Sequence, residues 1–304
     1  MKWAALYHQP TNSSGQWSTP LGLLVALEAE GIKVWHCPFA EPDRVVLPSL
    51  REFEEHSIEA LLVLYAGPGV ELDRQLLLLR LQINRAHLDL KIICELGDEP
   101  QTRCHNARRV QVADLSLSPD QPSVEHWRSL GAHCVWFTHW ADTALFHSDP
   151  AVVRSRRIVT TVGRRRYTGL LHAVFGPLFV NRRCEGQQNT HLYNSGLIAF
   201  QYARWRELTR RVFEAAACGC CVVANRLDPG AGLEQLFVDG ESIVLYSNCW
   251  ELILRLARLL IHPERAARIG ANGQSIVLRS HTQNSRARQL INLFDRLACN
   301  QGAP

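Results

Sequence analysis

The 304-residue sequence has a single methionine, and only three of its 33 basic residues are lysines. No apolar run approaches the roughly 18 residues that a membrane-spanning helix needs, so we expect no transmembrane segment. The first apolar stretch is too short for a secretory signal, and Tyr7 and His8 stand where a cleavage site would lie. We therefore expect a soluble, cytoplasmic protein in which residues 3–7 form the first strand.

Three common cofactor and metal motifs are also missing. There is no G-x-G-x-x-G fingerprint, because the loop over residues 9–18 offers only Asn-Ser-Ser-Gly. There is no D-x-D pattern to hold a metal beside a diphosphate. Among ten cysteines, Cys218 and Cys221 alone have C-x-x-C spacing, and no second pair or nearby histidine completes a zinc site. We expect no cofactor, no metal site and reduced cysteines.

The net charge of +4 conceals an uneven distribution. Residues 1–145 carry 12 Lys and Arg against 18 Asp and Glu, whereas residues 146–304 carry 21 against 11. Arginine makes planar, bidentate contacts with phosphate, so the second half suits a phosphate-bearing ligand. Nucleic-acid binding is an alternative, but the acidic first half argues against a continuous phosphate-tracking surface. Solvated helix faces would explain the same composition without any ligand.

Short apolar runs alternate with helical patterns along the whole chain, which favours parallel sheets built from βαβ units. We expect strands at residues 3–7, 32–36, 61–64, 91–94, 115–117, 134–138, 157–162, 178–180, 197–200, 221–224 and 243–246. The pattern restarts after a polar stretch at 142–156, which we interpret as a hinge. The prediction is an α/β protein with two Rossmann-like domains, residues 1–145 and 146–304, and a ligand cleft at the carboxyl ends of their strands.

Some helix limits and buried faces can also be predicted. Thr19 is typical of an N-cap and Gly31 of a helix end, so a helix is expected between them. A second helix is expected over about residues 72–86. In the helix expected over 250–261, apolar residues at helical spacing predict one buried stripe: Ile253, Leu256, Ala257 and Leu260.

Residues 211–225, Arg-Val-Phe-Glu-Ala-Ala-Ala-Cys-Gly-Cys-Cys-Val-Val-Ala-Asn, resemble the helix–turn–strand near the donor site of GT-B glycosyltransferases, especially the spore-maturation (CgeB-like) branch. Other pieces resemble the same family in the same order, at residues 140–142, 161–164, 192–195, 230–240, 262–265, 269–273 and 280–282. The resemblance covers residues 136–292. It implies an N-terminal acceptor domain and a C-terminal nucleotide-sugar donor domain that face each other across a cleft, with a C-terminal helix crossing back to the N-terminal domain.

The resemblance also implies donor-binding residues. Glu214 would accept hydrogen bonds from the two ribose hydroxyls, while Arg164 and Arg211 would contact the diphosphate in place of a metal. The other donor-side positions are Gly15, Gly163, Asn194, Asp228, Gly230, Gly232 and Glu234. Structural interpretations compete with these, since Arg164 lies in a run of three arginines that could be solvated surface. Where many retaining members have a second glutamate, this chain has Arg206, so the stereochemical outcome is left open.

An inverting enzyme needs a general base near the acceptor hydroxyl, whereas a retaining one does not. The candidates are Asp98, in the acidic cluster at residues 95–100, His8 and His139, because each follows a predicted strand at the expected cleft. A carboxylate in such a loop can equally cap a helix, and a histidine can simply end a strand.

Together these features predict a metal-independent glycosyltransferase that moves a sugar from a nucleotide-sugar donor, UDP-linked, to an acceptor that the sequence does not identify. The acceptor could be a glycan, a lipid, a protein, a small molecule or a nucleic acid. A non-catalytic nucleotide-sugar sensor or assembly protein fits the same residues, as does a nucleotide-sugar epimerase or hydrolase. The sequence does not indicate an oligomeric state.

Overall fold

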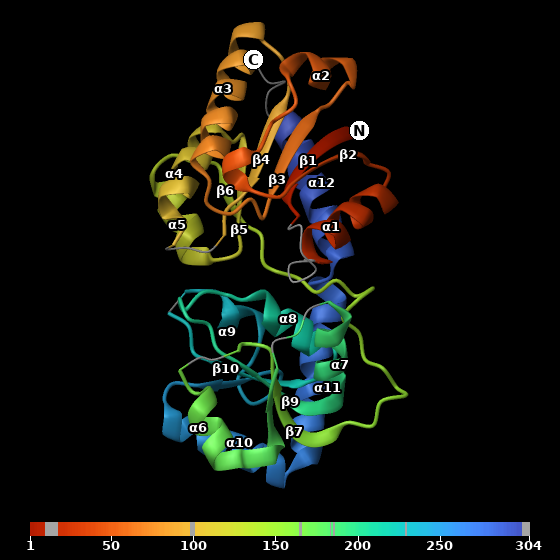
Figure 1. Ribbon diagram of the computed structural model, residues 1–304, viewed down its shortest axis with the longest axis vertical. Coiled ribbons are helices and arrows are strands. Elements are labelled where there is room, and N and C mark those ends of the chain that lie inside the picture. Colours follow the sequence, from red (N-terminus) through yellow and green to blue (C-terminus); the bar gives the residue numbers. More distant parts are fainter. Residues whose placement is uncertain are drawn as a thin grey trace. The chain divides into compact units, whose positions relative to one another are not determined.

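The protein is described by a computed structural model that covers residues 1–9, 18–97, 101–163, 166–182, 184, 186–228 and 230–299. It consists of two compact units, each with its own parallel sheet (Figure 1). The first contains Met1–Thr138 and Arg286–Pro304, and the second contains His139–Ser285. The division thus falls a few residues before the expected limit at 145, and the last helix belongs mostly to the first unit.

The first unit contains a six-stranded sheet in the order β2-β1-β3-β4-β5-β6, with all neighbouring strands parallel. The strands are β1 (Lys2–His8), β2 (Lys33–Phe39), β3 (Ala60–Leu64), β4 (Lys91–Glu95), β5 (Leu115–Ser118) and β6 (Cys134–Trp136). β3 and β4 are buried at every position, as expected for strands covered on both faces. All six lie where the apolar runs predict them, within a few residues.

The helices of this unit are α1 (Ser18–Ala29), η2 (Pro42–Arg44), α2 (Leu50–Glu55), α3 (Val70–Ala86), α4 (Arg103–Val112), α5 (Gln121–Ser129) and most of α12 (Gln283–Cys299). α1 begins at Ser18, so the prediction of Thr19 as its N-cap is wrong, because Thr19 lies inside the helix. Such limits commonly shift by one or two residues because several polar residues in a row can serve as caps. Gly31 adopts a φ of +91° just after α1, which confirms it as the stop.

The C-terminal helix α12 is held to the first unit by both apolar and polar contacts. The Phe294 ring lies 5.1 Å from that of Trp3, centroid to centroid, and Arg288 forms an ion pair of 2.7 Å with Glu30. Arg286 is buried, and its Nε donates to the Thr138 carbonyl at 3.1 Å. Burial lowers the pKa of Arg286 to about 10. These contacts explain why the chain returns to the first unit at its end.

The second unit contains a five-stranded parallel sheet in the order β11-β10-β9-β7-β8. Its strands are β7 (Ser155–Thr160), β8 (Phe179–Asn181), β9 (Gly196–Gln201), β10 (Cys221–Asn225) and β11 (Val244–Tyr246). From β7 the chain moves outward to β8 and then returns to the other side of β7, where β9, β10 and β11 follow. The strand order therefore reverses between β7 and β9, which is the kind of position where open α/β sheets bind ligands.

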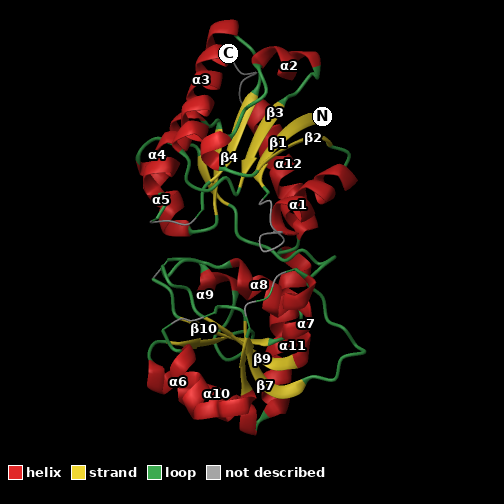
Figure 2. Ribbon diagram, in the orientation of Figure 1, coloured by secondary structure: helices red, strands yellow, loops and turns green. Residues whose placement is uncertain are grey.

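Helices cover both faces of this second sheet (Figure 2). They are α6 (Thr168–Phe175), η3 (Gly176–Leu178), α7 (Gln187–Ser195), α8 (Arg210–Ala217), α9 (Leu233–Leu236), α10 (Cys249–Ile261) and α11 (Pro263–Ser280). α7 and α8 contribute to one core cluster, through residues such as Tyr193 and Phe213. α6 and α10 contribute to the other, through residues such as Leu171 and Leu256. No helix in the described ranges is both long and apolar enough to cross a bilayer.

The buried stripe of α10 differs from the one predicted. Leu252, Leu256 and Leu259 are buried, whereas Ile253, Ala257 and Leu260 are only half-buried. The predicted stripe is therefore rotated by one position around the helix. The reason is that α10 is apolar on most of its circumference, so spacing alone does not tell which stripe faces the sheet.

α11 approaches the start of β10 so closely that a side chain would not fit at Gly270. A Cβ there would lie 2.5 Å from the Gly219 carbonyl oxygen, which is backbone and cannot swing away. We expect Gly270→Ala to lower the free energy of unfolding by about 1–3 kcal/mol. Gly169→Ala, in α6, is the matched control because nothing lies within 4 Å of its Cβ position. Urea midpoints would measure both, and equal midpoints would contradict this packing.

Candidate functional site

Polar residues gather at the carboxyl ends of three neighbouring strands in the second unit. Thr161 directly follows β7, while Gln201 and Asn225 are the last residues of β9 and β10. Because these strands are parallel, their carboxyl ends form one edge of the sheet. This edge contains the reversal point between β7 and β9. Figure 2 shows α8 and α9 at one end of the second unit and α6 and α10 at the other.

The buried hydroxyl of Tyr193, from α7, bridges two of these strand ends. Its oxygen lies 3.0 Å from Oγ1 of Thr161, and the amide Nε2 of Gln201 donates to it at 3.2 Å. Burial raises the pKa of the Tyr193 phenol above its usual value, and the negative charge of Glu214 adds to that effect. The phenol therefore keeps its proton and fixes the positions of the two strand ends.

Two polar atoms near this phenol are buried without a hydrogen-bond partner among the described residues. They are Oε1 of Gln201, whose residue is 1% exposed, and Nε of Arg211. The positive charge of Arg211 is close enough to Tyr193 to offset part of the rise in its pKa. Buried polar atoms normally have partners, so these two indicate that a water or a ligand group belongs at this edge.

α8 brings opposite charges together within its first two turns. Arg210 and Arg211 occupy the first turn, and Glu214 follows one turn later with its carboxylate 2.8 Å from Nε of Arg210. The Glu214 side chain is only 6% exposed, so it does not point into solvent. In the described part of the chain, the Thr209 hydroxyl makes no capping hydrogen bond to α8. The N–H groups at this helix start, together with the arginines, suit an anion.

The loop between β9 and α8 is fixed by Asn225. The Asn225 side chain accepts from the Ala203 backbone N–H at 2.7 Å and donates to the Ala203 carbonyl at 3.3 Å. A hollow of about 10 Å³ lies beside this contact, lined in part by Gln201 and Thr209. It has room for roughly one water molecule. A nucleotide would therefore bind on the surface of this edge and not inside the unit.

Of the predicted donor residues, Glu214 and Arg211 lie together on α8, but Asn194 has a different environment. The Asn194 Oδ1 accepts from the Asp149 backbone N–H and from Arg154, each at 3.0 Å. Its Nδ2 donates to the carbonyls of His147 at 2.9 Å and Thr190 at 3.0 Å. These bonds hold the segment 147–154 against α7. They explain the burial of Asn194 without any ligand.

The glycine loop before α9 is exposed at Asp228 and Gly230, is buried at Gly232, and makes an ion pair through Asp228. Gly230 and Gly232 have φ values of +85° and +94°, which few other residues adopt. Asp228 is paired with Arg206 at 2.7 Å. Arg206 therefore contacts this loop. α9 has only four residues, so its dipole offers little to an anion.

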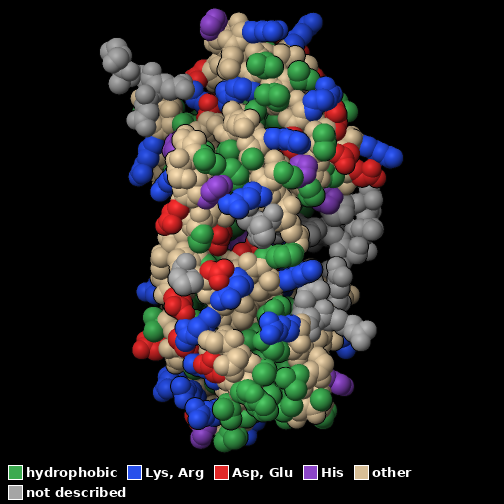
Figure 3. Space-filling model, turned by 90° about the vertical axis from the view of Figure 1, so that its left-hand side faces the viewer, with side chains coloured by type: hydrophobic (Ala, Val, Ile, Leu, Met, Phe, Trp, Pro, Cys, Tyr) green, Lys and Arg blue, Asp and Glu red, His purple; other side chains and the backbone are tan. Residues whose placement is uncertain are grey.

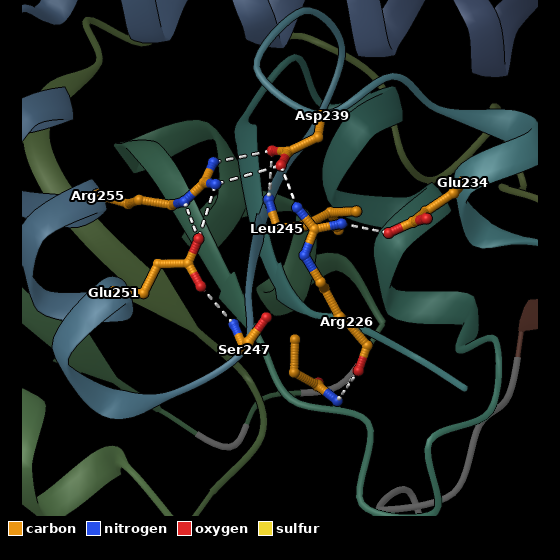
Figure 4. A network of polar contacts seen from close by, with 8 residues as sticks. Arg226, Glu234, Asp239, Leu245, Ser247, Glu251 and Arg255 are labelled. Atoms are coloured by element: carbon orange, nitrogen blue, oxygen red, sulfur yellow. Dashed lines mark hydrogen bonds and ion pairs between the residues drawn. The ribbon is translucent and has the colours of Figure 1, made fainter. Parts of the chain in front are cut away.

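Glu234 belongs to a network of ion pairs beyond β10 and β11 (Figure 4). It is paired with Arg226, which also contacts Asp239 at 2.6 Å. Asp239 accepts from Arg255 at 2.9 Å and from the Leu245 backbone N–H at 2.9 Å. The network ties the loop after β10 to the edge strand β11.

Gly163, which follows β7, has a φ of +65°, and its carbonyl accepts a hydrogen bond of 2.7 Å from the Asn181 side chain.

The predicted catalytic residues are only partly covered by the structure. Asp98, Gly15 and Arg164 lie outside the described residues. In the first unit, Nε2 of His8 lies 2.8 Å from the Ala40 carbonyl, at the end of β1. His139 is half-buried at the start of the second unit. The roles of all five residues stay predictions, as do those of the other donor positions.

In the described ranges, the cysteine and acidic side chains do not form a metal-binding site. All ten cysteines are free, and Cys218 and Cys221 are buried. Burial raises the pKa of the Cys220 thiol between them to about 11. Among the residues that the structure places, no three His, Cys, Asp or Glu side chains are positioned to share a metal ion.

The sequence profile of the glycosyl transferase-like family matches residues 154–292, which is most of the second unit and the first half of α12. No curated protein matches the chain significantly. Several solved structures match nearly all of it. Sucrose-phosphate synthase from Thermosynechococcus elongatus is 14% identical, with a TM-score of 0.70, over 98% of this chain and 100% of that one.

Two further structures extend the comparison. HepE from Anabaena, solved with UDP and glucose, is 14% identical over 97% of this chain and 100% of its own, with a TM-score of 0.65. The catalytic domain of starch synthase IV from Arabidopsis thaliana, bound to ADP and acarbose, is 8% identical over 97% and 99%, with a TM-score of 0.68. The chain therefore has the two-domain GT-B fold of glycosyltransferases, which confirms the predicted fold class. Membership of the CgeB-like branch stays a prediction.

Proposed function

We propose that this chain is a glycosyltransferase that takes a sugar from a nucleoside-diphosphate sugar, UDP-linked, held at the carboxyl edge of the second sheet. The observation that carries the proposal is the buried Glu214 carboxylate on α8, one turn after Arg210 and Arg211 and near the strand-order reversal. The family match to this unit supports the proposal. So do the nucleotides bound in two proteins of the same fold.

In this proposal each group on α8 has one task. An ionised carboxylate only accepts hydrogen bonds, so Glu214 would accept from both ribose hydroxyls, and Arg210 keeps it oriented. Arg211 and the N–H groups of α8 would balance the diphosphate without a metal. As the bond between the anomeric carbon and the diphosphate oxygen breaks, the leaving group gains negative charge. The same positive groups would then stabilise it more strongly than in the ground state.

The acceptor oxygen forms the new bond to the anomeric carbon and loses its proton. If the enzyme inverts, a base must take that proton, and Asp98, His8 and His139 remain our proposed candidates. Each can be tested by replacement with alanine in a transfer assay once an acceptor is known.

Turnover of the donor tests the proposed activity. The protein would be incubated with UDP-sugars, EDTA and cell extract, and mass spectrometry would detect sugar-tagged products. Transfer to an acceptor supports the proposal. Hydrolysis or epimerisation of the donor alone would reassign the same site to a hydrolase or an epimerase. Donor binding with no turnover would indicate a sensor, and the absence of any nucleotide binding would reject the site itself.

Arg211→Ala tests the diphosphate contact separately from the ribose contact. We expect its affinity for UDP to fall about 10- to 100-fold, because a charge-assisted hydrogen bond is worth about 1.5–3 kcal/mol. The affinity for uridine, which has no phosphate, should stay the same. Arg279→Ala, at an exposed position on α11, is the control. Calorimetric titration of the wild type and both variants in EDTA measures the two affinities, and an equal loss for uridine and UDP would contradict the assignment.

A further inference from the structure

α10 carries apolar side chains on its outer side as well as on its inner side. Trp250 is 74% exposed, Leu254 57% and Ile261 69%. They recur at i, i+4 and i+11, which places them on one face, while Leu252, Leu256 and Leu259 face the core. α10 also has a charged stripe between these two faces, so its outer apolar side chains are not part of the core and lie exposed on the second unit.

α6 and η3 extend this face. Leu170, Val174 and Leu178 are 38%, 47% and 41% exposed, and their inner neighbour Leu171 joins the same core cluster as α10. Figure 3 shows apolar side chains gathered in one area at the lower end of the view, where the second unit carries these helices. We call this area the α6–α10 patch, made of Leu170, Val174, Leu178, Trp250, Leu254 and Ile261. Contiguous apolar areas on a protein surface commonly mark an interaction site.

Arginines border the α6–α10 patch. On the side of α6 and η3, residues 168–181 contain no Asp or Glu. On the other side, Arg258 and Arg265 line a surface hollow of about 520 Å³ together with Leu254. In the described part of the chain, no acidic side chain forms an ion pair with either of these two arginines. Arg255, in contrast, is engaged by Glu251 and Asp239 (Figure 4).

We propose that the α6–α10 patch docks the protein on the surface of an anionic lipid bilayer. Trp, Leu and Ile side chains insert at the boundary between headgroups and acyl chains, while the bordering arginines contact lipid phosphates. The charges disfavour a second copy as the cover, because a two-fold interface would bring the same arginines face to face. The proposal does not depend on the enzymatic activity, because none of the six patch residues is a proposed donor or catalytic residue.

Flotation with lipid vesicles tests this surface. The purified full-length protein should float with vesicles of phosphatidylcholine mixed with phosphatidylglycerol, and remain behind with phosphatidylcholine alone. High sodium chloride should weaken the binding, since salt screens the arginines. The double variant Trp250→Ser/Leu254→Ser should lower the partition coefficient at least about tenfold, because two large apolar groups no longer insert. Arg258→Ser/Arg265→Ser should weaken binding only to the anionic vesicles.

The control is Val153→Ser, which removes a 93% exposed apolar side chain outside the patch and should bind as the wild type does. Circular dichroism melting shows whether each variant folds. Two results would overturn the proposal. One is a wild-type protein that does not float with anionic vesicles. The other is a dimer, measured by light scattering, that the Trp250→Ser/Leu254→Ser variant converts into a monomer, since the patch would then be covered by a second copy.

Discussion

Glu214→Gln is expected to lower both the affinity for UDP and kcat/KM for a UDP-sugar by about 30- to 1000-fold, which corresponds to about 2–4 kcal/mol. Glutamine keeps the shape of the side chain but replaces one acceptor oxygen with a donor nitrogen and removes the charge. Arg210 then loses its ion-pair partner, and one ribose hydroxyl meets a donor where it needs an acceptor. Because Glu214 is buried, water cannot readily compensate either loss.

The pattern of losses distinguishes a ribose contact from a general disturbance of α8. Uridine should lose affinity along with UDP, unlike the result expected for Arg211→Ala. Glu264→Gln, at a 74% exposed side chain on α11, should leave the constants unchanged. Melting curves verify that the variant is folded. If folded Glu214→Gln binds uridine and UDP as the wild type does, Glu214 is not a donor residue.

The strands of both sheets could be predicted because parallel strands are buried on both faces and therefore read as short apolar runs. The run at 91–94 and β4 (Lys91–Glu95) are an example. The division between the units could not be placed in the same way. It depends on Arg286 contacting Thr138, across 148 positions of sequence, and no local pattern encodes such a contact. The sequence also did not show which face of α10 is exposed, because the helix carries apolar residues on both its core side and its outer side.

The same distinction between local and long-range information applies to the residues of the candidate site. Glu214 and Arg211 could be named because they fall within one contiguous stretch that resembles a known family. Tyr193 and Gln201 were missed, because the bond between them joins α7 to β9 and exists only in the folded chain. One signal was available for Gln201, a polar residue that directly ends an apolar strand. For Asn194 the resemblance suggests a ligand contact, which stays a prediction, whereas the structure shows bonds to the segment 147–154.

Asn194→Ala is expected to lower the free energy of unfolding by about 2–4 kcal/mol. The residue is 1% exposed, and its amide makes four hydrogen bonds to Asp149, Arg154, His147 and Thr190. Alanine would leave the buried ends of those bonds without partners, which costs more than the net value of each bond. Urea unfolding at constant temperature measures the change. Asn272→Ala is the matched control, since Asn272 is exposed on α11 and makes one bond, to the Glu241 carbonyl at 2.9 Å.

The same variant also decides whether Asn194 serves the donor directly. Below its unfolding transition, Asn194→Ala should bind UDP about as tightly as the wild type, because its four bonds are all to the protein. The loss would then appear in the unfolding midpoint and not in the affinity. An unchanged midpoint with a large loss of UDP binding would mean the reverse, and it would restore Asn194 to the donor site. Since Asn194 directly follows Tyr193 on α7, that result would also extend the site from the strand ends onto this helix.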